Sequence, residues 1–324
     1  MCIAKVMATF MYCNFKSFRL LALYPGQVCW KCESSKGGDD LGYSYTNLHP
    51  DAAWRNTIWS SLPWVQTPEL ANCRAFDPTM LAADLLHVFH LGTGRDLLGS
   101  ALKILVGMRY FAGNSIDKSL GQASVRLKNF AKQNRLMLTL KKLTKQNLAW
   151  ASDLYPEIKC KGYDTYIVLS WLVKEIETNP PISPVREVQE MLDEMCTALW
   201  SADGWLRMLT HAPMHLTDMQ QLQKTVLGNI FMTAYVSLAQ RAVVERKKLW
   251  RVRPKIHLLH HMVLEDRPSR LNPHYMSTWM DEDFIKRTMR VKKKTHKRQS
   301  TASTLSRWLL GVAVKLQEML EQLR

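Results

Sequence analysis

The chain has 324 residues, 47% of them hydrophobic, with 11 tryptophans and a formal net charge of +16. This composition excludes a disordered chain, and no apolar run reaches the roughly 18–20 residues that a membrane-spanning helix needs. Lys16 and Arg19 interrupt the apolar start of the chain, and no small-residue cleavage site follows, so we expect neither a signal peptide nor a membrane anchor. We therefore expect a soluble intracellular protein.

The first part of the chain, residues 1–80, is predicted to be a loop-rich N-terminal piece. Residues 25–80 are rich in Gly, Pro, Asp, Asn and Trp and show no long helical period. Such composition indicates turns and loops around short strands.

The middle of the chain, residues 81–250, is predicted to be a helical body, because apolar residues recur there at helical spacing. Residues 81–111 break at LGTG (91–94), which predicts two helices, and NPPISPV (179–185) separates two later ones. The same pattern predicts further helices in residues 124–143 and 222–250 and a closing helix in residues 303–323. With residues 251–324 as a C-terminal part, the chain is expected to be mainly α, with a minor β component.

The cysteines indicate a metal more than a disulfide. The chain has 7 cysteines, an odd number that suits a reducing compartment. Only Cys29 and Cys32 are close in sequence, and two thiolates in a CxxC turn can bind one tetrahedral zinc. A single CxxC supplies only half of the ligands that a structural zinc requires.

Three histidines, His257, His260 and His261, fall within five residues and can supply the other half. His257 and His261 are one helical turn apart, so both imidazoles face the same side of a helix. The sequence therefore predicts a structural Cys2His2 zinc site, with His260 as the alternative ligand if the helix is rotated. A pair of buried thiols beside histidines that only form hydrogen bonds remains the other interpretation.

Most of the positive charge lies in one segment. Residues 240–298 contain 17 Lys+Arg and 6 Asp+Glu. Charge concentrated in this way indicates a polyanionic partner, most often nucleic acid, although a solvated basic face would look the same.

The densest part is Phe284–Arg298, which carries eight basic residues directly after the acidic triplet at 281–283. At helical spacing they would form a broad positive face that holds the DNA backbone without recognising bases. A nuclear-localisation signal and an exposed linker are the alternatives. The predicted DNA-binding residues are Lys286, Arg287, Arg290, Lys292, Lys293, Lys294, Lys297 and Arg298.

The early CxxC, the D-x-x-H block at Asp84–His87, and the histidine pair followed by an acid are a combination that resembles the catalytic region of DDE transposases of the CACTA-like group. The V(D)J recombinase is a more distant relative of that group. DLLHVFHLGTGRDLLGSAL, which contains Asp84 and His87, resembles the D-x-M-H…LG…R-x-LL segment of that family. RPKIHLLHH…WMDEDFIKR resembles its K-x-H-x-L-x-H segment, which leads to the last catalytic acid. The chain also resembles transposon-derived open reading frames.

This resemblance implies an RNase H-like core, to which residues 1–80 contribute, interrupted by a large all-helical insertion. In such a core, carboxylates bind two Mg²⁺ ions that stabilise the attacking and leaving oxygens of phosphoryl transfer. It implies that Glu282 is the final catalytic acid and that the Cys2His2 zinc fixes the helix that presents it. It also implies DNA as partner, a nuclear location and possible homo-oligomers.

The chain departs from the family pattern before the CxxC, where the earlier catalytic aspartates are expected. Residues 1–32 contain no Asp and no Glu. Asp84 could replace one of the missing catalytic aspartates. We expect it instead to be a helix N-terminal or hydrogen-bonding residue, with His87 as its partner. We therefore expect an N-terminally truncated and catalytically incomplete core that neither cuts nor joins DNA strands by itself.

Three hypotheses follow from the sequence. The first is a transposase-derived DNA-processing protein or its incomplete remnant. The second is a non-catalytic, zinc-stapled helical protein that binds DNA. The third is a helical interaction scaffold whose charge is incidental. The salt dependence of DNA affinity separates the last two.

Overall fold

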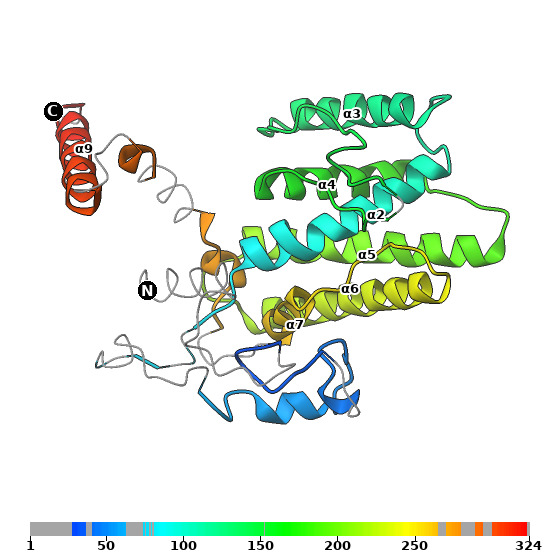
Figure 1. Ribbon diagram of the computed structural model, residues 1–324, viewed down its shortest axis with the longest axis horizontal. Helices are drawn as coiled ribbons and strands as arrows, with labels where there is room; N and C mark the ends of the chain where they lie inside the picture. Colours follow the sequence, from blue (N-terminus) through cyan, green and yellow to red (C-terminus); the bar gives the residue numbers. More distant parts are fainter. Residues whose placement is uncertain are drawn as a thin grey trace. The chain divides into compact units, whose positions relative to one another are not determined.

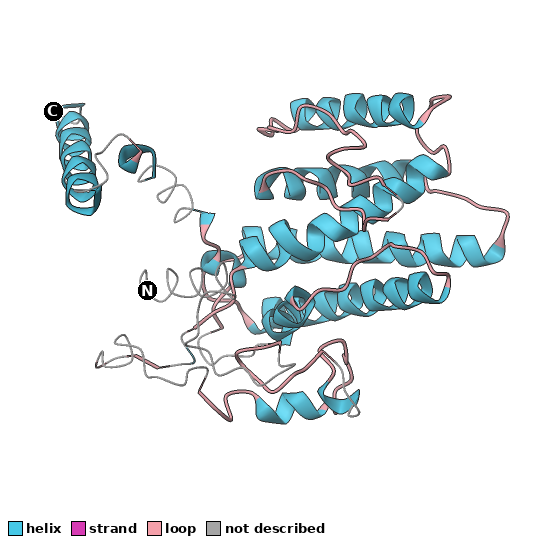
Figure 2. Cartoon of the chain, in the orientation of Figure 1, coloured by secondary structure: helices cyan, strands magenta, loops and turns pink. Residues whose placement is uncertain are grey.

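The protein is described here from a computed structural model, whose described parts are almost entirely helices and connecting loops (Figures 1 and 2). The structure describes residues 28–36, 41–62, 74, 76–77, 79, 81–151, 153–264, 270–279, 289–293 and 300–322. Within these ranges, β pairing is limited to two isolated bridges, Ser35 with Ser44 and His215 with Leu271. The prediction of a mainly α protein is confirmed.

The chain divides into two compact units, Met1–Ser277 and Thr278–Arg324. The first unit holds both the CxxC piece and the helical body. Its longer helices are η5 (Leu86–Thr93), α2 (Gly94–Gly107), α3 (Ile116–Gln133), α4 (Gly162–Thr178), α5 (Arg186–His211), α6 (Asp218–Val244) and α7 (Lys255–Leu264). The second unit contains α9 (Ser300–Gln322). No helix in the described ranges is both long and apolar enough to cross a membrane.

The helices of the first unit form a stack that begins with α3 and continues through α4, α5 and α6 (Figure 1). α2 and η5 pack across α4, and α7 packs on α6 and η5. Aromatic rings fill the centre: Phe89 lies 6.2 Å from Trp205 and 5.8 Å from Phe231, centroid to centroid. Burial of such large rings contributes much of the hydrophobic stabilisation of a core.

The predicted break at 91–94 exists, but the chain does not form a loop there. Leu86–Thr93 has wide π-type turns that run directly into α2, and Gly92 leaves helical geometry at φ −128° and ψ −112°. The ammonium of Lys255 donates to the carbonyl oxygen of His87 at 2.9 Å, which satisfies a backbone acceptor beside the distortion. A Cβ at Gly92 would lie 2.7 Å from Cδ of Lys255, so glycine leaves room for this side chain.

The helix predicted at 124–143 is only half helical. α3 begins earlier, where the Ser115 side chain accepts a hydrogen bond from the amide of Lys118, and it ends at Gln133. Arg135 then adopts a left-handed conformation with φ 55°, and residues 136–144 continue without regular secondary structure. Because the partly buried leucines at 136, 138 and 140 alternate with exposed residues, this segment follows the period of a strand and not that of a helix.

A charged cluster joins the chain before α7 to α2. Arg253 contacts Asp96 at 2.6 Å and Glu157 at 2.8 Å through the same guanidinium nitrogen. Burial raises the pKa of Asp96 to about 6, although Arg253 opposes the shift. The amide of Trp250 donates to the hydroxyl of Ser100 at 2.9 Å. This bond is a second link between α2 and the segment that leads into α7.

Two helical glycines should respond oppositely to the same substitution. At Gly99, an added Cβ would lie 2.5 Å from the backbone N and Cα of Glu157, whereas at Gly121 nothing lies within 4 Å. We expect Gly99→Ala to destabilise the protein by about 1–3 kcal/mol, because backbone must move. We expect Gly121→Ala to stabilise it by about 0.5–1 kcal/mol, since alanine favours the helix. Urea unfolding of both variants measures this, and equal shifts in the two would contradict it.

Candidate metal centre

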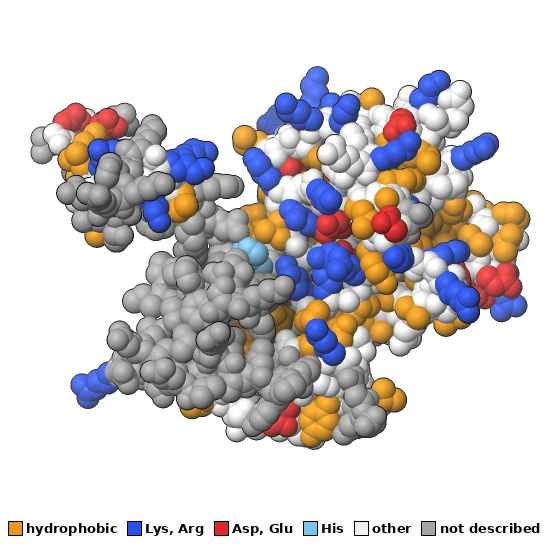
Figure 3. All heavy atoms as spheres, viewed as in Figure 1, with side chains coloured by type: hydrophobic (Ala, Val, Ile, Leu, Met, Phe, Trp, Pro, Cys, Tyr) orange, Lys and Arg blue, Asp and Glu red, His pale blue; other side chains and the backbone are white. Residues whose placement is uncertain are grey.

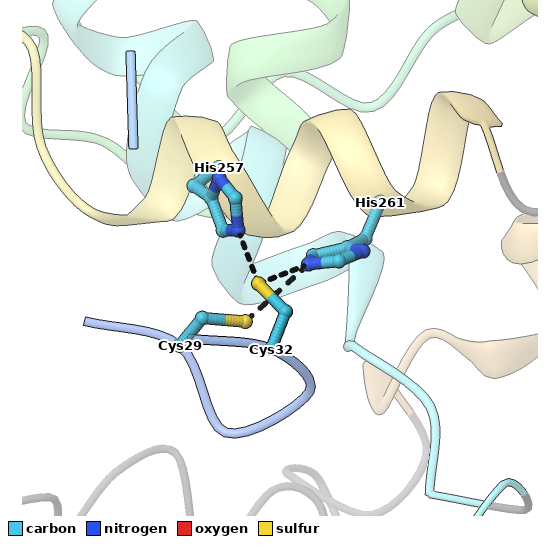
Figure 4. A group of neighbouring side chains, drawn as sticks. All are labelled: Cys29, Cys32, His257 and His261. Carbon is cyan, nitrogen blue, oxygen red and sulfur yellow. Dashed lines mark hydrogen bonds between the residues drawn. The ribbon is translucent and has the colours of Figure 1, made fainter. Parts of the chain in front are cut away.

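The histidine-bearing segment forms α7, and the described side chains of Ile256 to Val263 are all buried. His257 and His261 stand one turn apart, and Figure 4 shows both rings turned toward the loop that carries Cys29 and Cys32. The helix is therefore the rigid support for half of the site. The other half comes from a segment more than 220 residues earlier in the chain.

The cysteine loop is shaped by its own backbone hydrogen bonds. The amide of Val28 donates to the carbonyl of Ser34 at 2.9 Å, which closes the loop. The amide of Lys31 donates to Sγ of Cys29 at 3.3 Å. The carbonyl of Lys31 in turn accepts from the amide of Trp59 at 2.7 Å, so the loop is attached to the short helix η2 (Ala53–Thr57) and the turn after it.

The four side chains converge on one buried point. Sγ of Cys32 lies 3.1 Å from Nε2 of His257 and 3.4 Å from Nε2 of His261, and Sγ of Cys29 lies 3.4 Å from the same nitrogen of His261. All four ligand atoms lie within 4.8 Å of one another. Tetrahedral zinc, with bonds of about 2.3 Å to sulfur and about 2.0 Å to nitrogen, separates such atoms by about 3.3–3.8 Å. The group can therefore hold a metal such as zinc.

The electrostatics of the thiols also suit a metal. Burial, reinforced by Cys32, raises the pKa of Cys29, whereas the hydrogen bond from Cys29 and then the two imidazoles lower the pKa of Cys32. Burial lowers the pKa of His261 to about 4, so its ring is neutral at neutral pH. A thiolate at Cys32 beside the neutral ring of His261 is suited to bind a metal, and binding would release the proton on Cys29.

One tryptophan forms a wall of the site. The ring centroid of Trp54 lies 4.5 Å from that of His257 and 5.2 Å from that of His261, and Trp54 is fully buried. Its indole nitrogen donates to the carbonyl of Asn47 at 3.1 Å, which fixes the ring. Trp54 gives the site an apolar wall on this side, and a low local dielectric strengthens charge interactions inside it.

His260, the alternative ligand, lies outside the group. Arg55 Nη2 donates to its Nε2 at 3.4 Å, and burial followed by the charge of Arg55 lowers the pKa of His260 to about 3. A neutral His260 accepts this bond and ties α7 to η2 beside the metal ligands. Sequence reasoning missed Trp54 and Arg55, because no spacing rule connects WR at 54–55 with a helix about two hundred residues later.

Asp84 and His87 form a pair at the start of η5 and are not part of the metal group. One carboxylate oxygen of Asp84 contacts Nδ1 of His87, and the other accepts from the amide of Leu86 at 3.0 Å. Asp84 thus acts as a helix N-terminal residue, as the hydrogen-bonding interpretation expects. In the described ranges, the only group of three or more His, Cys, Asp or Glu that can hold a metal is the Cys2His2 set.

The acidic and basic segment is described only in part. Glu282, Lys286, Arg287, Lys294, Lys297 and Arg298 lie outside the described residues. Arg290, Lys292 and Lys293 belong to a short helical turn at 289–293, where the amide of Lys293 donates to the carbonyl of Met289 at 3.1 Å. All three basic side chains are exposed, as charges that meet phosphates must be.

A comparison of the chain with protein-family models, curated proteins and solved structures finds no match.

Proposed function

We propose that this chain is a transposase-derived DNA-binding protein whose CxxC piece is attached to its helical body by a structural zinc ion. The observation that supports this proposal is the convergence of Cys29, Cys32, His257 and His261. This ligand order, with a helical body between the two halves, accords with the family that the sequence resembles.

Zinc is the metal that this ligand set favours. Two thiolates and two imidazoles in a tetrahedral arrangement select zinc, whereas Mg²⁺ takes oxygen ligands. The site is closed, because all four ligands come from the protein and all are buried. A closed site leaves no position for water or substrate, so the zinc is structural.

Strand transfer is not part of the proposal. The resemblance implies an RNase H-like core in which Glu282 and two further carboxylates bind Mg²⁺, but Glu282 lies outside the described residues. Asp84, the substitute, is engaged with His87 and the start of a helix. An incomplete RNase H-like core without strand-transfer activity therefore remains our hypothesis. The nuclear location and self-association likewise remain predictions of the sequence.

DNA binding is proposed to use the basic segment at 286–298. Its eight cations outnumber the acids of the preceding triplet, and the described side chains of Arg290, Lys292 and Lys293 are exposed. Each phosphate that a cation neutralises releases counterions, which gives a log–log salt slope of about −0.9 per contact. Four to six contacts would give a slope of about −4 to −5 with little sequence preference.

The test replaces Lys292, Lys293 and Lys294 with alanine and titrates duplex binding with salt. If all three contact phosphate, the slope should become shallower by about 3 units, and competitor duplexes of different sequence should compete about equally. A suitable control is Lys174→Ala with Arg186→Ala and Lys247→Ala, three exposed cations that each have a carboxylate partner. If the triple variant kept the parental slope, the segment at 286–298 would not be the DNA-binding site, and a chain without any salt-dependent affinity for duplex DNA would be better described as an interaction scaffold held together by zinc.

A further inference from the structure

A second basic surface lies far in sequence from the segment at 286–298. Residues 118–145 contain eight Lys+Arg and no Asp or Glu. They comprise most of α3 and the chain that follows it, at the outer end of the helical stack. In Figure 3, blue side chains gather along the upper edge, where Figure 1 places α3.

α3 buries one face and exposes a basic one. Leu120, Ala123, Leu127 and Ala131 are turned into the core. The opposite face carries the exposed side chains of Lys118, Lys128 and Lys132, with Gln122 and Asn129 between them. Lys128 and Lys132 are one turn apart and therefore lie side by side.

The chain after α3 returns along the helix and adds two more cations. The amide of Leu143 donates to the hydroxyl of Ser124 at 2.8 Å, which places this segment beside the middle of α3. The amide and hydroxyl of Thr139 donate to the buried carboxylate of Asp164 at 2.8 and 2.6 Å. These bonds fix this segment, and Lys141 and Lys142 are exposed next to the helix.

The charge of this surface is not neutralised locally. Asp117 is paired with Lys145 at 2.8 Å, Glu175 is paired with Arg126, and Asp164 is buried under Thr139. In the part of the chain that the structure describes, no carboxylate lies within ion-pair distance of the six remaining cations. These are Lys118, Lys128, Lys132, Arg135, Lys141 and Lys142.

We propose that these six cations form a second binding surface for the phosphate backbone of duplex DNA. The proposal extends the DNA binding proposed above and rests on it. Lys118 and Lys132 are fourteen residues apart on one helix, which is about 21 Å. A row of fixed cations of that length suits a regular rod with one charge per about 1.7 Å better than a small anion.

The neighbouring side chains suit phosphate as well. Gln122, Asn129 and Gln133 are exposed among the cations, and their amides can donate hydrogen bonds to phosphate oxygens. None of these contacts recognises a base. The surface therefore adds affinity for the DNA backbone without adding sequence preference.

The experiment measures the salt dependence of binding to a short mixed-sequence duplex with two double variants, Lys128→Ala/Lys132→Ala and Lys141→Ala/Lys142→Ala. Each pair should make the log–log slope shallower by up to about 1.8 units, at about 0.9 per lost contact. The matched control is Lys174→Ala/Arg186→Ala, which removes the same charge from cations that lie near Glu177 and Glu190. All replaced side chains are exposed, and circular dichroism checks that each variant is folded.

The outcomes separate this inference from the function proposed above. If both pairs behave like the control while the triple variant at 292–294 flattens the slope, the second surface is wrong and the first stands. If the pairs flatten the slope and the triple variant does not, the surface on α3 is the DNA-binding one. Stronger binding to anionic lipid vesicles than to DNA, lost in the same two pairs, would overturn the inference in favour of a membrane surface.

Discussion

Replacing Cys32 with serine should remove zinc from this protein. The parent is expected to contain one zinc per chain by elemental analysis, and the variant to contain almost none. Structural zinc contributes on the order of 10 kcal/mol to the folding of small zinc-binding domains at neutral pH, and loss of one of four ligands removes most of that stabilisation. His261→Ala should have the same effect, because Nε2 of His261 lies 3.4 Å from both sulfurs.

The loss of structure that follows loss of zinc should be confined to the part of the chain around the cysteine loop. Among their described positions, residues 28–62 contain only two short helices, η1 (Leu41–Tyr43) and η2. Without the metal, little regular secondary structure within this piece holds it in place. We expect its amides to exchange with solvent much faster in the Cys32 variant. The helices from α2 to α6 pack on one another, and their far-ultraviolet circular dichroism should change little.

Two residues outside the ligand set serve as controls for the metal site. His260→Ala alters the same helix but removes the contact with Arg55 and no metal ligand, so zinc should stay bound. Cys160→Ser removes a buried thiol that contacts Thr165 and lies outside the group. A parent protein without zinc, or a His260 variant that loses zinc as completely as the His261 variant, would refute the assignment.

The metal ligands were predictable because each half of the set is a local pattern. Cys29 and Cys32 form a CxxC, and His257 and His261 have the i, i+4 spacing of one helix face. Local patterns depend only on the backbone geometry of a short segment. That the two halves meet was a hypothesis from ligand counting, and the structure brings them together.

The rest of the site and part of the fold depend on contacts between distant residues. Leu136, Leu138 and Leu140 continue the apolar pattern of α3 closely enough to be included in one predicted helix. The segment leaves the helix instead, and Asp164 on another helix accepts two hydrogen bonds from Thr139. The distortion near Gly92 is a second example. There Lys255 donates to the carbonyl oxygen of His87, which lies more than 160 residues away in the sequence.

Replacing Arg253 with alanine should be among the most destabilising single changes in the helical body. Asp96 is almost fully buried, and its ion-pair partner is Arg253. Removing one member of a buried ion pair leaves an uncompensated charge, which costs about 3–5 kcal/mol. The melting temperature should fall by about 5–9 °C. Thermal and urea unfolding measure both quantities.

A neutral replacement of the pair isolates the electrostatic cause. In Asp96→Asn/Arg253→Met, neither position carries a charge, and Glu157, the other partner of Arg253, is partly exposed to water. The double variant should therefore be more stable than Arg253→Ala, because a buried ion pair can often be replaced at little cost when both charges go together. A double variant as unstable as Arg253→Ala would show that packing, and not charge, dominates.

The pH dependence of Arg253→Ala gives the sharpest test. Burial already raises the folded pKa of Asp96 to about 6 beside Arg253, and without the guanidinium it should rise further. A folded pKa above the unfolded value means that the folded state binds the proton more tightly, so stability is gained as pH falls. The deficit of the variant relative to the parent should therefore be largest above the raised pKa.

That deficit should shrink by up to about 1.4 kcal/mol per pH unit as pH falls toward 6, because in this window only the variant takes up the proton on Asp96. Below pH 6 the parent takes up the same proton, so both proteins gain stability alike. A deficit that grows as pH falls would contradict this account. Arg253 stands two residues before α7, which carries His257. The zinc content of Arg253→Ala therefore shows whether the position of His257 depends on this buried pair or on the metal alone.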